Sequence, residues 1–187
     1  YRPGQKDPRP TVLWVGRIKK YKNLDHLLRA YRTVKQKVPD TQLIIIGSGD
    51  QERNMRDLAK ALGLRDVHFL GKIPEEEKIR WMQRAWILAS TSMIEGWGMT
   101  VTEAAACGTP AVAYDVPGLR DSVRHMETGI LVEPGDIEQL AEAIEMLLAD
   151  SGLRNKLSEN AYRYVQGFSW DKTALKFLEV FENAAHR

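Results

Sequence analysis

The sequence predicts an α/β fold built on one doubly wound parallel sheet. Short apolar runs alternate along the chain with amphipathic stretches of helical spacing. One run, 43–46, is apolar throughout, as expected of a parallel strand that is covered on both faces. The alternation continues from residue 11 to 149 without a linker. We therefore expect a single domain whose strands are separated by helices.

The individual elements follow from the same pattern. We expect strands at 12–15, 43–46, 67–70, 86–89, 111–114 and 130–132. We expect helices at 24–38, 51–62, 75–84, 100–106, from 136, over 153–166 and from 169 to the end. Asn23 stands where it can cap the first helix, Gly63 ends the second, and Pro74 opens the third. Asp136 with Gln139 three residues later predicts a capping box.

The composition excludes several classes of protein. Hydrophobic residues are 43% and charged residues 28% of the chain, which excludes disorder, collagen and a disulfide scaffold. The net charge of +2 is too balanced for a nucleic-acid binder that relies on a large basic field. Cys107 is the single cysteine, so no internal disulfide or cysteine-based zinc site can form. We expect no metal site. We also expect a cytoplasmic location, since a lone thiol fits a reducing compartment.

The start of the chain is typical of a linker. Residues 1–10 contain three prolines, no apolar core of a signal peptide and no initiator Met. We interpret them as an inter-domain linker, and the chain as a fragment that begins just before a domain. No apolar run approaches the length that a membrane-spanning helix needs.

Residues with ligand-binding chemistry follow the predicted strands at their carboxyl ends, where open α/β sheets bind ligands. Gly16, Arg17 and Lys22 follow the first strand, and the two cations suit a diphosphate or, alternatively, form a solvated basic turn. Gly47 opens a Gly-Ser-Gly-Asp turn that either is a tight βα turn or lets the backbone approach a nucleoside. Position 52 is Glu, so the dinucleotide fingerprint G-x-G-x-x-G fails and a dinucleotide oxidoreductase is disfavoured.

The stretch 95–103 carries the most information. Gly96 and Gly98 leave the backbone bare beside a helix N-terminus, whose N–H groups and dipole suit a phosphate. Glu103 is expected in the first turn of that helix, where it either complements the dipole or grips a vicinal diol such as ribose. Glu95 precedes the helix and has no obvious structural duty. A carboxylate there suits sugar hydroxyls or an oxocarbenium-like centre.

Together these motifs resemble the GT4 family of retaining glycosyltransferases. The resemblance covers about residues 11–166. It rests on Gly16-Arg17-x4-Lys22-Asn23, Ile46-Gly47-x-Gly49, Val67-x-Phe69-x-Gly71 and Ser92-x2-Glu95-Gly96-Trp97-Gly98-x4-Glu103-Ala104-x2-Cys107-Gly108-Thr109-Pro110. The two glutamates correspond to the family's E-x7-E signature. The resemblance implies the C-terminal half of a GT-B fold, in which two Rossmann-like domains face a cleft. Its implied parts are the linker 1–10, a nucleotide-sugar donor-binding domain 11–168, and a helix 169–187 that crosses back to an absent N-terminal domain.

The resemblance also implies roles for individual residues. Arg17 and Lys22 would bind the diphosphate and stabilise the leaving group, while Glu95 would hold the transferred sugar near its reacting carbon. Glu103 would bind the ribose hydroxyls. The remaining implied contacts are made by the backbone. A phosphate or the sugar would meet Gly98, Met99, Thr100 and Val101, and the base would meet Lys72 and Ile73. Gly16, Gly47 and Gly96 would lie along the same site.

The implied reaction moves a hexosyl group from a UDP-, GDP- or ADP-sugar to an acceptor, with retention and without a metal or other cofactor. The acceptor, a sugar or a lipid-linked molecule, would bind mainly to the absent half, so this chain alone would be inactive. Nucleic acid is not an expected partner, and peripheral association of a full-length enzyme with the cytoplasmic membrane face is left open. Two alternatives on the same fold are a nucleotide-sugar epimerase and a non-catalytic nucleotide-sugar-binding subunit.

Overall fold

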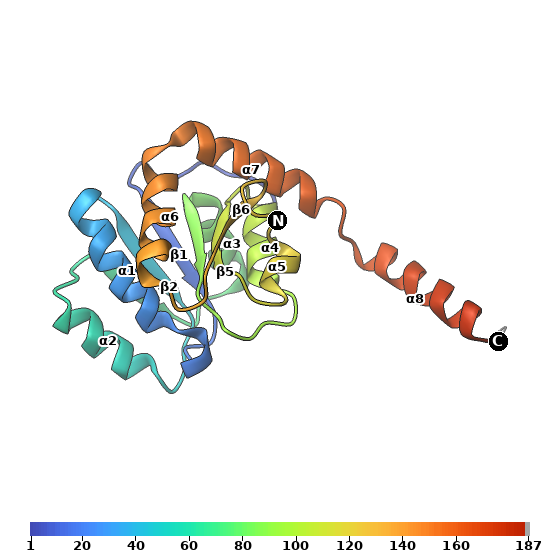
Figure 1. Ribbon diagram of the computed structural model, residues 1–187, viewed down its shortest axis with the longest axis horizontal. Coiled ribbons are helices and arrows are strands. Elements are labelled where there is room, and N and C mark those ends of the chain that lie inside the picture. The colour runs from blue at the N-terminus through green and yellow to red at the C-terminus, as the bar shows by residue number, and fades with distance from the viewer. Residues whose placement is uncertain (186–187) are drawn as a thin grey trace.

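The computed structural model describes residues 1–185, in which a parallel sheet lies between two layers of helices (Figure 1). The strands pair in the order β3-β2-β1-β4-β5-β6, and all neighbours are parallel. Their bounds are β1 (Thr11–Val15), β2 (Gln42–Ile46), β3 (Val67–Gly71), β4 (Ile87–Ser90), β5 (Ala111–Tyr114) and β6 (Gly129–Val132). The predicted doubly wound sheet is confirmed. The end of the last predicted helix, 186–187, lies outside the described residues.

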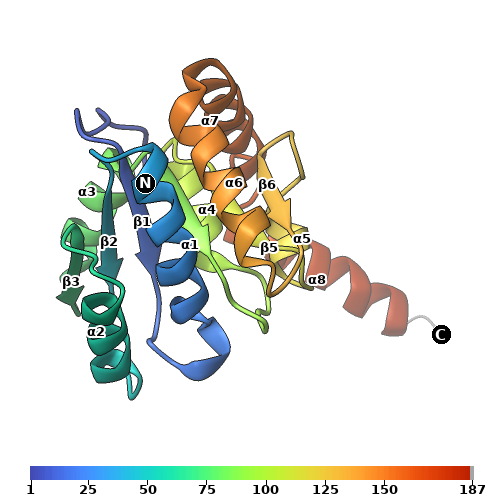
Figure 2. The same ribbon diagram turned by 60° about the vertical axis from the view of Figure 1, so that its left-hand side comes forward.

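Helices cover both faces of this sheet (Figure 2). Their bounds are α1 (Leu24–Lys37), α2 (Glu52–Ala61), α3 (Glu75–Arg84), α4 (Met99–Ala106), α5 (Leu119–Ser122), α6 (Ile137–Ala149), α7 (Ser151–Val165) and α8 (Trp170–Ala185), with a 3₁₀ turn η1 (Lys20–Lys22). On one face α1 packs against α2 and α6, and on the other α4 packs against α3, α5 and α7. Alternation of helices between the faces follows from right-handed crossovers that run outward in both directions from β1.

The structure differs from the expectations at short elements and caps. η1 and α5 were not predicted, because they are too short to show a helical period. Asn23 adopts a left-handed conformation (φ 43°) and makes no side-chain cap, since it also closes η1. The Asp136 carboxylate accepts the Gln139 N–H at 2.9 Å, as predicted. The Gln139 side chain, however, accepts from the Glu133 N–H instead of closing the capping box on Asp136.

The core lies along the strands and the helix faces that cover them. Apolar side chains from β1, β2, β4 and β5 are almost fully buried, and α1 and α6 pack on them from one side. Cys107 at the end of α4 is buried and forms no disulfide. The core members from the strands include Val12, Leu13, Leu43, Ile44, Ile45, Ile87, Leu88, Val112 and Tyr114.

The last described helix, α8, projects away from this core (Figure 1). Its apolar side chains are between 56% and 65% exposed. They are Leu175, Phe177, Leu178, Val180 and Phe181. The helix is therefore amphipathic without a covering partner in the structure. Among the described residues, none of the helices is both long enough and apolar enough to cross a membrane.

Residues 1–10 have no regular secondary structure but lie against the α3–β4 region. The Asp7 N–H donates to the Arg84 carbonyl at 2.8 Å, and the Trp86 indole N–H donates to the Asp7 carbonyl at 2.7 Å. The Lys6 ammonium donates to the Thr109 hydroxyl at 2.6 Å. Burial lowers the pKa of Lys6 to about 8.

Backbone contacts join the loops that follow β1, β2 and β3. The Gly16 N–H donates to the Ile46 carbonyl at 3.0 Å, and the Gly47 N–H donates to the Gly71 carbonyl at 2.8 Å. A Cβ on Gly47 would lie 1.8 Å from the Gly16 carbonyl oxygen, and Gly47 has φ 130°. Glycine is thus required at position 47 by the neighbouring chain, which supports the tight-turn interpretation of this motif.

Replacing Gly47 by Ala is expected to destabilise the fold far more than a matched change at Gly63. Gly63 also has positive φ (71°), but a Cβ added there would have no neighbouring atom within 4 Å. We expect Gly63→Ala to lower the free energy of unfolding by about 1–2 kcal/mol, and Gly47→Ala by more than about 3 kcal/mol because the clash adds to the strain. Urea unfolding measures both. Equal losses would show that the close approach to Gly16 is not maintained.

Lys6→Met is expected to stabilise the chain at pH 7 and to lose part of that advantage at pH 9.5. Below pH 8 Lys6 is charged in the folded and unfolded states, and burial penalises the folded one. The penalty fades as the pH rises from about 8 towards the ordinary value of 10.5. The stability difference between variant and parent should shrink by roughly 1–2 kcal/mol over this interval.

The comparison is made by urea unfolding of both proteins at both pH values. Burial raises the pKa of Cys107 and Lys6 lowers it, so both proteins carry Cys107→Ala to keep this thiol out of the difference. A difference that stays constant with pH would mean that Lys6 is not buried as a charge.

Candidate nucleotide-sugar site at the sheet switch point

The strand order reverses between β1 and β4, and open α/β sheets bind ligands at such a switch point. The loops that leave these two strands are joined by several contacts. The Thr91 hydroxyl donates to the Lys22 carbonyl at 2.7 Å, and the Met93 N–H donates to the Tyr21 carbonyl at 2.9 Å. The Lys22 ammonium forms an ion pair with Glu95. These contacts hold the two loops against each other at the switch point.

The Lys22–Glu95 pair unites two residues that were singled out separately from the sequence. The side chains are 16% and 19% exposed, so the pair is only partly screened by water. Lys22 binds Oε1 of Glu95, whereas Oε2 has no partner among the described residues and is not buried. A Cβ on Gly118 would lie 2.3 Å from the Glu95 carbonyl oxygen, so the backbone before α5 packs closely against the backbone at Glu95. Glu95 thus presents one anchored and one open oxygen.

Arg17 lies at the same loop but is held differently. Its side chain is exposed, and its one described side-chain contact is with the Tyr21 hydroxyl at 3.5 Å, which is at the limit of a hydrogen bond. Lys22 is anchored while Arg17 remains solvated. A guanidinium on a loosely held side chain can reorient toward an anion at little cost.

Glu103 is held by a lysine that sequence reasoning missed. The Lys78 ammonium lies 3.0 Å from Oε2 of Glu103 and 2.9 Å from Oε1 of Glu75. The Lys78 and Glu103 side chains are 16% and 19% exposed. The expectation that Glu103 lies in the first turn was wrong, because α4 already begins at Met99. Complementing the helix dipole is therefore not its role.

Lys78 has an electrostatic setting that the sequence does signal. It is the fourth residue of α3, directly after Glu75, Glu76 and Glu77, where the helix dipole disfavours a cation. Burial alone would lower the pKa of Lys78, but hydrogen bonds to Glu75 and Glu103 outweigh it and raise the pKa above its usual range. The sequence signal is therefore a lysine at a helix N-terminus, but the nearby Glu75 is the partner that it indicates, and Glu103 is not.

The N-terminus of α4 offers backbone donors beside Glu95. Gly98 adopts a left-handed conformation (φ 72°) and caps the helix without a side chain. Within residues 1–185 no partner is found for the backbone N–H groups of Gly98, Met99 and Thr100. The Val101 N–H already donates to the Gly98 carbonyl at 2.9 Å, which removes Val101 from the expected set of free donors. The Cβ position of Gly96 has open space around it, so none of the described residues requires glycine there.

The other predicted positions surround this group less closely. Lys72 and Ile73 form the connection between β3 and α3, with Lys72 exposed and Ile73 packed against the core. The Gly16 and Gly47 backbones are engaged in the loop contacts described above, so they shape the sheet edge. Trp97 turns to the far side of its loop, where its ring meets Phe168 edge-on at 5.2 Å.

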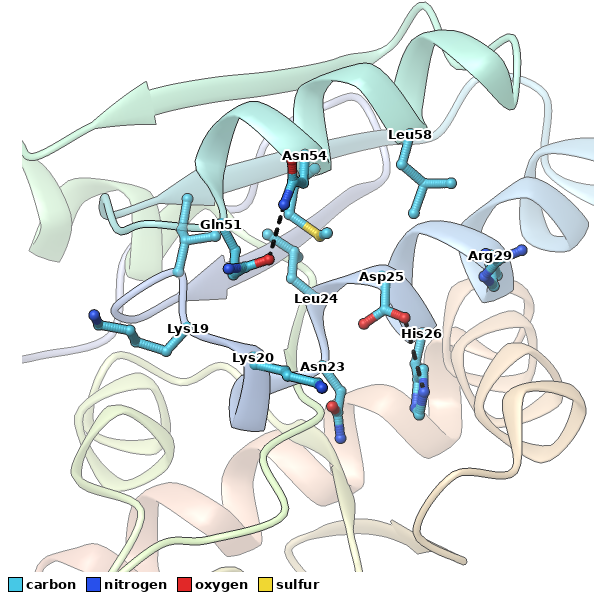
Figure 3. A pocket seen from close by; sticks show the side chains of 12 residues that line it. Lys19, Lys20, Asn23, Leu24, Asp25, His26, Arg29, Gln51, Asn54 and Leu58 are labelled. Carbon is cyan, nitrogen blue, oxygen red and sulfur yellow. Dashed lines mark hydrogen bonds and ion pairs between the residues drawn. The ribbon is translucent and has the colours of Figure 1, made fainter.

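A cavity of about 680 Å³ lies apart from this group, between the start of α1 and α2 (Figure 3). Its floor is apolar and its rim carries Lys19, Lys20 and Arg29. None of the residues predicted for the site lines it. In the described part of the chain there is also no cluster of three or more His, Cys, Asp or Glu side chains that could hold a metal ion.

Comparison with known proteins is decisive for the family. A family model described as glycosyl transferases group 1 matches residues 2–164. The chain belongs to the group 1 glycosyltransferases. A D-inositol 3-phosphate glycosyltransferase of Salinispora tropica is 36% identical over 184 residues, which cover 93% of this chain and 38% of that protein. The chain spans less than half the length of this and other similar curated relatives.

Solved structures agree with the family. The C-terminal domain of the group 1 glycosyltransferase LpcC from Francisella tularensis superimposes with a TM-score of 0.77 at 28% identity, covering 89% of this chain and 87% of that one. Anabaena HepE, solved in complex with UDP-glucose, gives 0.84 at 26% identity, covering 94% and 49%. The chain therefore has the Rossmann-like fold of the C-terminal domain of a GT-B glycosyltransferase, as the resemblance implied.

Lys22 and Glu95 are expected to be energetically coupled. In a double-mutant cycle with Lys22→Met and Glu95→Gln, the coupling free energy should be about 1–2 kcal/mol, because the pair is mostly shielded from water. The exposed pair Arg124–Glu127, with side chains 54% and 56% exposed, is the control and should show much weaker coupling. Urea unfolding of the single and double variants gives both values. Additive effects at Lys22 and Glu95 would refute the shielded pair.

Proposed function

We propose that the chain binds a nucleotide-sugar donor at the β1/β4 switch point and acts as the donor half of a retaining hexosyltransferase. The observation that carries the proposal is the Lys22–Glu95 pair, which joins the two loops of the switch point beside the α4 N-terminus. Support also comes from HepE, a structural relative solved with UDP-glucose. The names of the reported relatives give no support to an epimerase or a non-catalytic binding subunit.

The diphosphate of the donor would lie between cations and backbone donors. The Lys22 ammonium has three N–H groups, so it can bind a phosphate oxygen while it remains bonded to Glu95. Arg17 would turn in from solvent and bind bidentately. The N–H groups of Gly98, Met99 and Thr100 would add the helix N-terminus to the same charge. In this proposal the chain itself neutralises the leaving group, so no metal ion is required.

The sugar and the nucleoside would occupy the two sides of the diphosphate. The open oxygen of Glu95 would accept hydrogen bonds from sugar hydroxyls, and the open space at Gly96 would let the sugar approach the backbone. Glu103 would accept hydrogen bonds from the ribose hydroxyls. The base would contact the backbone at Lys72 and Ile73, which leaves the choice among uracil, guanine and adenine unassigned.

The proposed reaction is a substitution at the anomeric carbon on the face of the leaving group. The bond between the anomeric carbon and the phosphate oxygen breaks, and the nucleoside diphosphate leaves with the electron pair. An acceptor hydroxyl forms the new bond on the same face and gives its proton to a phosphate oxygen. Lys22 and Arg17 would stabilise the charge that develops on the leaving group. The acceptor would bind mainly to a part of the protein outside this chain, so the chain alone would transfer little sugar.

A nucleoside diphosphate is expected to raise the Tm of this chain without added metal. At a hundred times its Kd, a ligand adds about 2.7 kcal/mol of stability, which corresponds to a rise in Tm of about 5–10 °C for a domain of this size. UDP, GDP and ADP and their glucose conjugates are tested in EDTA, and again with Mg²⁺.

One base should be favoured, and the shift should be the same with and without Mg²⁺. Glu103→Ala should reduce the shift, whereas Glu127→Ala, an exposed change outside the site, should leave it unchanged. The proposal fails if none of the nucleotides moves the Tm of the parent at millimolar concentration.

A further inference from the structure

The two glutamates of the site share one arrangement. In each, one carboxylate oxygen is bound by a lysine from a different βα unit: Lys22 binds Oε1 of Glu95, and Lys78 binds Oε2 of Glu103. In each, the second oxygen has no partner among the described residues and is not buried. Both pairs have the same low exposure, 16% for the lysine and 19% for the glutamate. Lys19 and Asp50 form a pair of the same kind with side chains 41% and 59% exposed, so it is their low exposure that sets these two pairs apart.

From this geometry we infer that Lys78 is a positioning residue, which holds Glu103 so that its open oxygen meets the ribose of the donor nucleotide. The inference rests on the proposed function and adds a residue that is not part of the site motifs. Lys78 comes from α3 and Glu103 from α4, so the pair also fixes the two helices relative to each other.

Lys78 is well placed to hold a carboxylate firmly. Its ammonium is itself bonded to Glu75 and lies 5.8 Å from the centre of the Tyr1 ring, whose hydroxyl donates to Glu75. Three contacts of this kind restrict a flexible side chain to one position. The anchored oxygen of Glu103 then stays in place when the other oxygen binds a ligand.

Such an anchor matters because a glutamate is flexible. Without Lys78, the carboxylate of Glu103 would sample several rotamers, and ligand binding would have to order it at a cost in affinity. A carboxylate held in advance binds two neighbouring hydroxyls without that cost. The effect should therefore appear in recognition of the ribose hydroxyls and not in general affinity for diphosphate.

The experiment compares ribose with deoxyribose. Kd values are measured by calorimetry for whichever of UDP, GDP and ADP binds the parent most tightly, and for its 2′-deoxy and 3′-deoxy forms. The parent should prefer the ribonucleotide roughly tenfold, since a hydrogen bond to a charged group is lost in at least one deoxy form. Lys78→Met should bring this preference close to one. Lys78→Arg should retain most of it, because Arg supplies the same charge.

Controls separate positioning from a merely structural role. Arg80→Met, an exposed change on the same helix with no described partner, should keep the parent's preference. If Lys78→Met weakens the ribonucleotide and both deoxy forms equally, Lys78 is only a tether between α3 and α4 and the inference is overturned. If Lys78→Met does not fold, Lys78→Gln, which keeps a polar head group without the charge, is measured by the same criterion.

The failure of the proposed function has a different signature. If no nucleotide binds the parent, the donor site itself is refuted, and the inference on Lys78 falls with it. If the parent binds nucleotides and Glu103→Ala loses the ribose preference while Lys78→Met keeps it, only the inference on Lys78 is refuted.

Discussion

The ion pair between Lys22 and Glu95 is the interaction on which the site depends. It joins the loop after β1 to the loop after β4. At this switch point the chain runs from β1 toward one edge of the sheet and from β4 toward the other. The Thr91 hydroxyl and the Met93 N–H join the same two loops through hydrogen bonds to the Lys22 and Tyr21 carbonyls. Because the pair is mostly shielded from water, the attraction between its two charges is screened less than in an exposed pair. The rest of the sheet edge is arranged around that fixed point.

Glycines build this edge for two different reasons. Gly47, Gly98 and Gly118 stand where a side chain would strike a neighbouring segment, so they allow the loops to lie against each other. Gly96 has neither a positive φ nor a close neighbour, and the protein itself gives no reason for it. This contrast separates the glycines that the packing of the loops requires from Gly96, whose role in the proposed function is to leave room for the donor sugar.

Most of the fold could be predicted from the sequence because strands and long helices differ in the spacing of their apolar residues. The sequence did not predict η1 and α5, which are too short for a repeating pattern, or the caps at Asn23 and Gln139, which depend on the neighbouring turn. For the site, the strand-end rule placed Lys22 and Glu95 at one edge, but their mutual contact joins residues far apart in the chain. Lys78 was missed because its partner Glu103 belongs to another helix. The bond of the Val101 N–H to Gly98 depends on where α4 begins, and the predicted start was one residue late.

The sequence separation of the two lysine–glutamate pairs links the site to folding. Lys78 and Glu103 are 25 residues apart and lie on successive helices, whereas Lys22 and Glu95 are 73 residues apart. The second pair forms only when β4 docks beside β1, after the chain has run out to β3 at the sheet edge and returned. Closing so long a loop has a higher entropic cost than pairing neighbouring units. In partly folded chains that contain only β1, β2 and β3, the loop after β1 therefore lacks the ion pair that holds it in the complete sheet.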